Sequence, residues 1–417
     1  MIRNLITYFM GDSLRRNSIF LISSNIVNNL LGFFFWVIAA HYYGTVDVGL
    51  ATATISAVNL LASLARLGFG AGIIRFLPDE KDKSVLINTC FTIVGLLAFA
   101  LAFIFIFGIK FWSPALLFLR EDITILIVFI LTTFCVANFT LQNFVFIAYR
   151  SAGYSLILGA ISSVRLLVMI LLINFSVAGI VSSFGISFLL AFLIGIVFVY
   201  RINPEYRPIP SLRKNVVKNI ISLSFGNYIA NNLATLPRMI LPILLVNVMT
   251  PEMSAYFFIS WMIANLLFSV AYFTGDSLLA EISHDPQELR HQVIKAAKLI
   301  FAILIPANIV LFFFGSQLLS LFGVQYAEEG LHLLWMLAFS SIPLAINELF
   351  VVICLLDKSV RPMILIRIII AAVTIGGGYF LIGLYGLNAF GLTWLSINSA
   401  VMLFILPRIL KRINFKL

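Results

Sequence analysis

Apolar stretches of 20 or more residues alternate with short polar loops along the whole chain. An α-helix needs roughly 20 apolar residues to cross about 30 Å of hydrocarbon. Open strands would leave backbone groups without partners in lipid, and these continuous runs lack the alternation of a membrane barrel. We therefore predict an all-α polytopic membrane protein with about twelve transmembrane helices. The predicted spans are residues 17–41, 48–70, 85–109, 122–148, 154–174, 177–200, 216–248, 253–275, 293–315, 331–355, 364–384 and 387–407.

Composition supports a membrane protein and offers little for catalysis. Of the residues, 62% are hydrophobic and 11% are charged, whereas a soluble domain carries about 25% charged residues. The cysteines lie in apolar stretches and are interpreted as small buried hydrophobes, and the histidines show no ligand spacing. We expect no catalytic residues, no metal site and no cofactor.

The distribution of basic residues predicts the topology. An even number of spans places both termini on one side, and 22 of the 27 Lys and Arg residues then lie on that side. The opposite side carries only Lys110 and Arg120. This asymmetry predicts a multi-pass protein of the cell membrane with both termini in the cytoplasm. The net charge of +10 is thereby explained by topology, and nucleic acid is not an expected partner.

The two halves of the chain share a pattern. Leu-Arg-Arg-Asn at 14–17 precedes the first span, and Leu-Arg-Lys-Asn at 212–215 precedes the seventh. Asn-Leu-Leu at 59–61 in the second span recurs at 265–267 in the eighth. Because six spans per half is an even number, the repeats would be parallel. We predict two six-helix lobes around a central cavity: residues 1–200, a cytoplasmic linker at 201–215, and residues 216–417.

Arginines inside the apolar stretches are the candidates for ligand binding. Arg165 and Arg238 lie near the middle of their spans, and Arg66 lies near a span end, where snorkelling explains it equally well. A charge at the bilayer centre costs about 2.5–3.5 kcal/mol on insertion scales. Among the acids only Glu348 lies well inside a span, so embedded cations are in surplus. This surplus favours an anionic ligand such as a diphosphate, which guanidinium groups bind bidentately.

Glu348 has two interpretations. It forms an ion pair with Arg238, Arg66 or Arg165, or it acts as a proton-coupling acid. Arg238 lies between Pro237 and Pro242, which remove backbone hydrogen bonds and kink a helix, so this segment is a candidate moving part.

Six asparagines occur at helical spacing in the first and seventh spans. Polar side chains there must face protein or water, so they either contact sugar hydroxyls or bond helices together at ~0.6 kcal/mol each. Both interpretations remain open. The six are Asn25, Asn28, Asn29, Asn227, Asn231 and Asn232.

Several short motifs resemble a known family. They are Leu-Ala-Arg-Leu-Gly at 64–68, Ile-Arg-Phe-Leu-Pro at 74–78, Ala-Tyr-Phe at 255–257, Ser-Leu-Leu-Ala-Glu at 277–281, and Leu-Leu-Ser-Leu-Phe-Gly at 318–323 followed by Tyr326. With these motifs in this order, the chain resembles the polysaccharide and oligosaccharide-lipid flippases of the multidrug/oligosaccharidyl-lipid/polysaccharide exporter superfamily. The resemblance implies a two-lobed flippase that holds a lipid diphosphate on cavity arginines, here Arg66, Arg165 and Arg238.

The expected function is therefore transport. The substrate would be a polyprenyl-diphosphate-linked oligosaccharide, moved from the inner to the outer leaflet for assembly of a surface polysaccharide such as lipopolysaccharide. Expected partners are this lipid-linked oligosaccharide, membrane lipid, and glycan polymerases or transferases; the oligomeric state is open. One alternative is a cation-coupled multidrug exporter of the same superfamily. Others are a membrane glycan polymerase or ligase, which the short loops disfavour, and a non-transporting scaffold.

Overall fold

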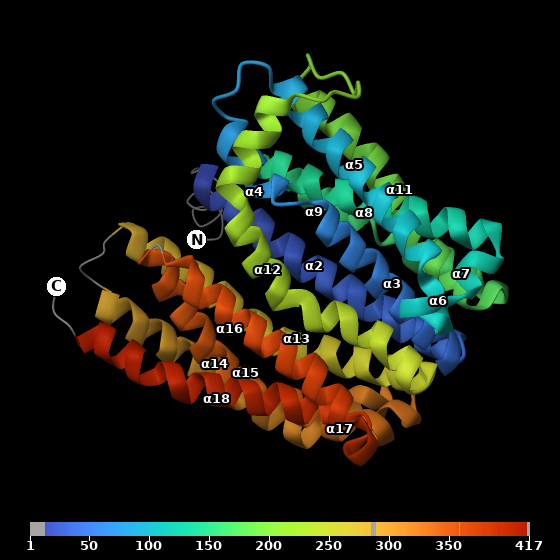
Figure 1. Cartoon of the computed structure of the whole chain (residues 1–417), viewed down its shortest axis with the longest axis vertical. Helices are drawn as coiled ribbons and strands as arrows, with labels where there is room; N and C mark the ends of the chain where they lie inside the picture. The colour runs from blue at the N-terminus through green and yellow to red at the C-terminus, as the bar shows by residue number, and fades with distance from the viewer. Residues whose placement is uncertain (1–12, 285–288, 358, 415–417) are drawn as a thin grey trace, which may run out of the picture. The chain divides into compact units, whose positions relative to one another are not determined.

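The computed structural model describes residues 13–284, 289–357 and 359–414, and every regular element among them is a helix. The N-terminal helices begin with α2 and run to α11 (Figure 1). Their bounds are α2 Ser13–Tyr42, α3 Thr45–Ala65, α4 Phe69–Phe76, α5 Lys83–Phe107, α6 Ile109–Trp112, α7 Phe118–Glu121, α8 Ile123–Ala148, α9 Gly153–Ile161, α10 Val164–Leu171 and α11 Ser176–Ile202. Short 3₁₀ turns lie at Pro114–Leu116 and Ile173–Phe175.

Longer helices make up the rest of the chain. They are α12 Lys214–Val248, α13 Pro251–His284, α14 Leu289–Ser320, α15 Val324–Leu356, α16 Val360–Ala372, α17 Gly378–Tyr385 and α18 Asn388–Asn414, with a π-helical turn at Val373–Gly377. Close contacts join α15 to α18 and α14 to α15, and α5 and α11 both lie against α8.

The helices fit the predicted number of spans. In the described part of the chain, 11 helical segments are long and apolar enough to cross a membrane, and a shorter apolar segment covers Ile26–Tyr42. Helix α2, Ser13–Tyr42, covers the whole of the first predicted span at 17–41. The last-but-one span begins at Val360 rather than 364, so it contains Arg361 as well as Arg367.

Contacts divide the chain into two compact units. One contains Met1–Tyr228 and Ile243–Pro251, and the other contains Ile229–Pro242 and Glu252–Leu417. Helix α12 contributes to both units, and one of the two boundaries within it lies directly after Pro242. The lobe bounds predicted from the repeat stay a prediction.

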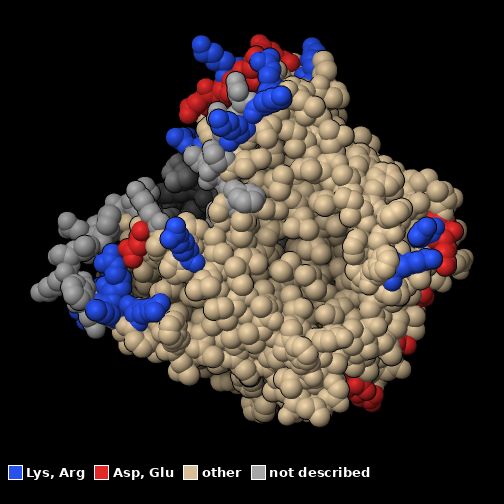
Figure 2. All heavy atoms as spheres, in the orientation of Figure 1, with Lys and Arg blue, Asp and Glu red and all other residues tan. Residues whose placement is uncertain are grey.

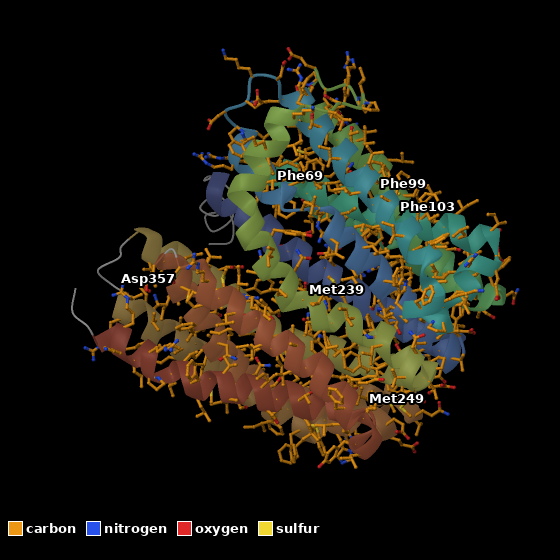
Figure 3. The ribbon with its side chains drawn as sticks, viewed as in Figure 1. Phe69, Phe99, Phe103, Met239, Met249 and Asp357 are labelled. Atoms are coloured by element: carbon orange, nitrogen blue, oxygen red, sulfur yellow. The ribbon has the colours of Figure 1, made fainter. Side chains whose placement is uncertain are left out.

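The surface between the charged patches is apolar. In the view of Figure 2, Lys, Arg, Asp and Glu gather in patches, and uncharged residues cover the wide areas between them. Large side chains such as Phe103, Phe313, Phe380 and Phe404 are exposed. Phe103 lies one turn beyond Phe99 on α5 (Figure 3). Such extensive apolar exposure on so many helices is expected where lipid replaces water as the solvent.

The segment between α11 and α12 is held against α5. The Asn88 side chain donates to the carbonyl oxygen of Arg207 at 2.6 Å, and the backbone N–H of Ser211 donates to Thr92 at 3.2 Å. Tyr206 is 1% exposed, and burial raises its pKa to about 12. The basic linker predicted from the sequence is therefore anchored to the N-terminal unit by its backbone and by a buried aromatic side chain.

Gly49 allows α3 to lie directly against the backbone of Pro251, which belongs to the same unit. A Cβ atom at this position would overlap the backbone carbonyl of Pro251. We expect Gly49→Ala to destabilise the protein by about 1–3 kcal/mol, because neither backbone can yield as a flexible side chain would. Thermal unfolding of the detergent-purified protein measures this effect.

Gly376→Ala is the matched control for that substitution. A Cβ atom at Gly376 meets nothing within 4 Å, so the same chemical change adds no overlap. Equal unfolding temperatures for the two variants would show that the contact between Gly49 and Pro251 does not limit stability.

Candidate functional site

Arg165 is a buried cation that lies at a helix break. Helix α9 ends at Ile161, and α10 begins at Val164. The hydroxyls of Ser162 and Ser163 donate to the carbonyls of Gly159 and Ala160, both at 2.6 Å, and the Ala160 carbonyl also accepts from the backbone N–H of Ser163 at 3.0 Å. Arg165 follows in the first turn of α10 and is only 8% exposed.

Aromatic rings surround the Arg165 guanidinium. Its carbon Cζ lies 5.1 Å from the ring centroid of Phe35 on α2 and 5.9 Å from that of Phe184 on α11. Its Nε has no hydrogen-bond partner, and no carboxylate of the described residues lies within ion-pair distance. Cation–π contacts recover part of the desolvation cost, but they do not neutralise the charge. This arrangement leaves the guanidinium able to receive an anion.

Arg66 lies where α3 ends. Leu67 and Gly68 adopt left-handed conformations, with φ angles of 43° and 82°, before α4 begins. The guanidinium turns back, and Nη2 donates to Ser63 Oγ at 3.1 Å. The hydroxyl of Tyr228 donates to the Leu64 carbonyl at 2.9 Å, so this break is held by α12. Arg66 is half-buried at the end of a span, and the snorkelling interpretation remains open for it.

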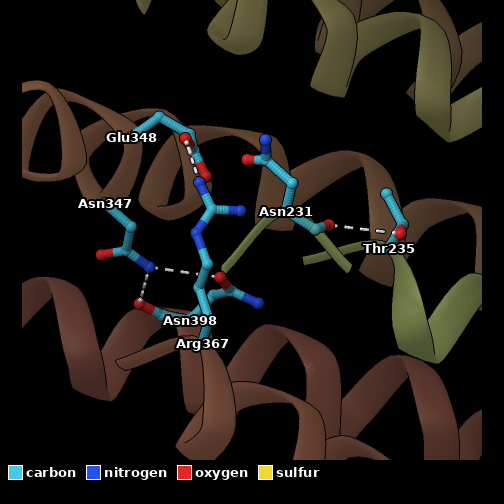
Figure 4. A network of polar contacts seen from close by, with 6 residues as sticks. All are labelled: Asn231, Thr235, Asn347, Glu348, Arg367 and Asn398. Atoms are coloured by element: carbon cyan, nitrogen blue, oxygen red, sulfur yellow. Dashed lines mark hydrogen bonds and ion pairs between the residues drawn. The ribbon is translucent and has the colours of Figure 1, made fainter. Parts of the chain in front are cut away.

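Glu348 forms its ion pair with Arg367. The distance from Arg367 Nη2 to Glu348 Oε2 is 3.1 Å, with side-chain exposures of 10% and 16% (Figure 4). Arg367 was counted from the sequence among the residues of the N-terminal side, and the partner of Glu348 was sought among Arg66, Arg165 and Arg238. That assignment of Arg367 was wrong, because Arg367 lies on α16 within a span.

A small cavity with both polar and apolar lining residues adjoins this ion pair. Its volume is about 30 Å³, enough for one or two water molecules, and Tyr272, Asn347 and Trp394 are among its lining residues. Asn347 Nδ2 donates to the carbonyl and side-chain oxygens of Asn398, both at 3.2 Å. Asn347 Oδ1, Trp394 Nε1 and Arg367 Nε lack partners among the described residues. Ordered water would satisfy them, so we interpret this cluster as a hydrated polar centre within the C-terminal unit.

Arg238 belongs to the same unit as this cluster. It lies on the α12 segment between Pro237 and Pro242, its side chain is exposed, and it lies within electrostatic reach of Tyr272. Tyr272 is in turn within reach of Glu348 and Arg367. Asp276, also on α13, lies within reach of Glu348. The polar centre therefore includes two residues, Arg367 and Tyr272, that the sequence argument missed. Arg367 could have been found, because it falls inside the predicted span 364–384.

The asparagines occupy different environments. Asn28 donates to Ser24 at 3.3 Å and lies against Gly159 of α9, where an added Cβ would lie 2.7 Å from Asn28 Oδ1. This position suits a contact between helices. Asn29 and Asn231 are exposed and Asn232 is half-buried. The side chains of Asn25 and Asn227 lie outside the described residues.

No cluster for a metal emerges from the part of the chain that the structure describes, where no group of three or more His, Cys, Asp or Glu residues comes together. All three cysteines are buried and free.

Comparisons with known proteins give a family and a fold. The family model described as "Polysaccharide biosynthesis protein" matches residues 14–245. An inward-facing multidrug resistance MATE family transporter of the MOP superfamily has a TM-score of 0.68 at 13% identity, covering 93% of this chain and 94% of that chain. The lipid II flippase MurJ, in an inward closed conformation, has a TM-score of 0.68 at 14% identity, covering 94% and 87%. No curated protein sequence matches this chain. The predicted all-α multi-pass fold is confirmed.

Proposed function

Because the chain belongs to the polysaccharide biosynthesis protein family, we propose that it moves a polyprenyl-diphosphate-linked oligosaccharide from the inner to the outer leaflet of the cell membrane. The product would serve the assembly of a surface polysaccharide. The observation that carries this proposal is Arg165, a buried cation that contacts aromatic rings and forms no ion pair with a described carboxylate. An anionic lipid head group would complete its environment.

The chemistry of Arg165 suits a diphosphate. A planar guanidinium donates two parallel hydrogen bonds to phosphate oxygens, and such charge-assisted bonds are roughly twice as strong as neutral ones. Phe35 and Phe184 lie within cation–π distance of the guanidinium, and its Nε has no hydrogen-bond partner among the described residues. Arg66 and Arg238 are candidates for further contacts with the same charge, and the exposed Asn29 and Asn231 are candidates for contacts with sugar hydroxyls.

Transport would proceed by alternating exposure of the substrate site to the two sides of the membrane. Helices can bend where their regular backbone hydrogen bonding is already interrupted. Such positions are the breaks at Arg66 and at Ser162–Ser163 and the prolines of α12. The asymmetry of the basic residues supports an orientation with both termini in the cytoplasm.

A cation-coupled multidrug exporter is the second candidate. The likeness to MATE transporters favours it as an alternative. Such an exporter needs an acid that binds and releases a cation during transport. Glu348 is engaged by Arg367 at 3.1 Å, which disfavours it in that role. Asp276, which lies in the span formed by α13 and within electrostatic reach of Glu348, is another candidate acid of the same unit.

A reconstituted transport assay tests the proposal. Purified protein in liposomes is given a fluorescent polyprenyl-diphosphate oligosaccharide, and a membrane-impermeant quencher is added outside. We expect protein to increase the fraction of probe that the quencher reaches, relative to liposomes that carry an unrelated membrane protein. Transport of a cationic dye under an ion gradient, with no movement of the lipid-linked sugar, would contradict the proposal and support the multidrug exporter. Elongation or ligation of the sugar would indicate a membrane enzyme instead.

A further inference from the structure

A second basic site lies at the far end of the C-terminal unit, where α15 and α18 both finish. An open pocket of about 480 Å³ is formed there by side chains of these two helices. Figure 3 marks Asp357 at this end of α15. The lining residues are Phe350, Ile353, Asp357, Arg408, Lys411 and Arg412. All belong to one unit, and none of them takes part in the polar centre around Glu348.

Positive charge predominates in this pocket. Arg412 Nη2 lies 3.0 Å from Asp357 Oδ1, and both side chains keep more than a third of their surface exposed. Asp357, the one carboxylate among the lining residues, is therefore already paired with Arg412. The Arg408 guanidinium lies 4.6 Å from the ring centroid of Phe404, and Lys411 is exposed without a described hydrogen bond or ion pair. Two cations are therefore left for a ligand.

The inner wall of the same pocket is apolar. Phe350 and Ile353 are 7% and 5% exposed and belong to a buried cluster with Val401, Ile405 and Ile409. A pocket with basic residues at its rim and hydrocarbon at its wall fits a molecule with an anionic head and an apolar body. Basic pockets between transmembrane helices at a membrane surface commonly hold lipid head groups.

We propose that the pocket formed by the ends of α15 and α18 binds the phosphate head group of an anionic membrane lipid. Arg408 and Lys411 hold the phosphate, and the charge of Arg412 is offset by Asp357. The lipid's glycerol backbone and first methylenes lie against Phe350 and Ile353. This site is separate from the proposed transport function and does not depend on it. The same phosphate chemistry has two sources in this membrane, a glycerophospholipid and an isoprenyl diphosphate, and we commit to the glycerophospholipid.

Basic residues in the last turn of a helix also have simpler explanations. They complement the helix dipole and snorkel to the membrane surface. These explanations account for charge at the end of α18, but they predict neither a formed pocket nor a preference among lipids. The test must therefore measure selective lipid retention at this site.

Native mass spectrometry of the full-length protein in detergent measures that retention. The probes are phosphatidylglycerol, phosphatidylcholine of the same acyl chains, and farnesyl diphosphate as a competitor. We expect the wild type to retain phosphatidylglycerol over phosphatidylcholine. In Arg408→Gln/Lys411→Gln the retention should weaken roughly 10- to 30-fold, as expected for removal of two interfacial charges.

Arg201→Gln/Lys298→Gln is the matched control, because it removes two exposed basic residues outside the pocket. Equal retention by the two double variants overturns the proposal. Asp357→Asn provides a second test if the pocket variant fails to fold. It removes the one negative charge of the lining, so retention of phosphatidylglycerol should rise several-fold, and the absence of a rise overturns the proposal. Displacement of phosphatidylglycerol by equimolar farnesyl diphosphate in the wild type would assign the phosphate site to an isoprenyl diphosphate instead.

Discussion

Replacing Arg165 with methionine is expected to reduce transport of a polyprenyl-diphosphate-linked oligosaccharide about 10- to 100-fold. Hydrogen bonds to charged groups are worth about 1.5–3 kcal/mol each, and the substitution removes both the donors and the charge. Methionine retains an unbranched apolar stem that fills the space between Phe35 and Phe184, so the packing of α2, α10 and α11 should survive. The quencher assay in liposomes measures the loss.

Arg165→Lys separates charge from geometry. Lysine keeps the charge but cannot donate two parallel hydrogen bonds from a planar group, so we expect an intermediate rate. Arg201→Met is the control, because Arg201 is an exposed arginine at the end of α11. Wild-type transport by a monodisperse Arg165→Met protein would exclude Arg165 as the diphosphate site. Equal losses in Arg165→Met and Arg201→Met would show a general effect of basic charge.

Replacing Glu348 with glutamine is expected to destabilise the C-terminal unit by about 3–5 kcal/mol. Breaking a buried ion pair from one side leaves the other charge without compensation, and Arg367 is only 10% exposed. The Nε atom of Arg367 already lacks a hydrogen-bond partner among the described residues, so no other acceptor of these residues stands ready at Nε to replace Glu348. Thermal or denaturant-induced unfolding in detergent, followed by tryptophan fluorescence, measures the change.

The double variant Glu348→Gln/Arg367→Met distinguishes the two interpretations of Glu348. If the pair is structural, removal of both charges should recover most of the lost stability, because a buried pair is often replaceable by apolar groups at little cost. Transport should then recover as well. Recovered stability without recovered transport would instead show that Glu348 or Arg367 acts on the substrate or on a coupling ion. Unchanged stability in Glu348→Gln alone would contradict the interpretation that Arg367 is left buried without a compensating charge in this variant.

The class of protein and the number of its membrane segments followed from the sequence, because both depend on the hydropathy summed over short stretches of the chain. A stretch of about 20 apolar residues favours a spanning helix wherever it occurs, and the basic residues between stretches predict orientation without any knowledge of contacts. Arg165 could also be recognised from the sequence as a candidate for ligand binding, because a charge in the middle of an apolar stretch is energetically unfavourable unless it serves a function.

The partners of these charges were decided by the tertiary structure. Phe35 and Phe184 lie far from Arg165 along the chain, and only the packing of α2, α10 and α11 brings the three together. Glu348 and Arg367 are 19 residues apart on two helices, and their pairing depends on the packing of α15 against α16. Hydropathy gives the position of a residue along the membrane normal but not the direction in which its side chain points. An ion pair, a cation between two rings and a basic pocket each depend on that direction, which is set by the packing of helices distant in sequence.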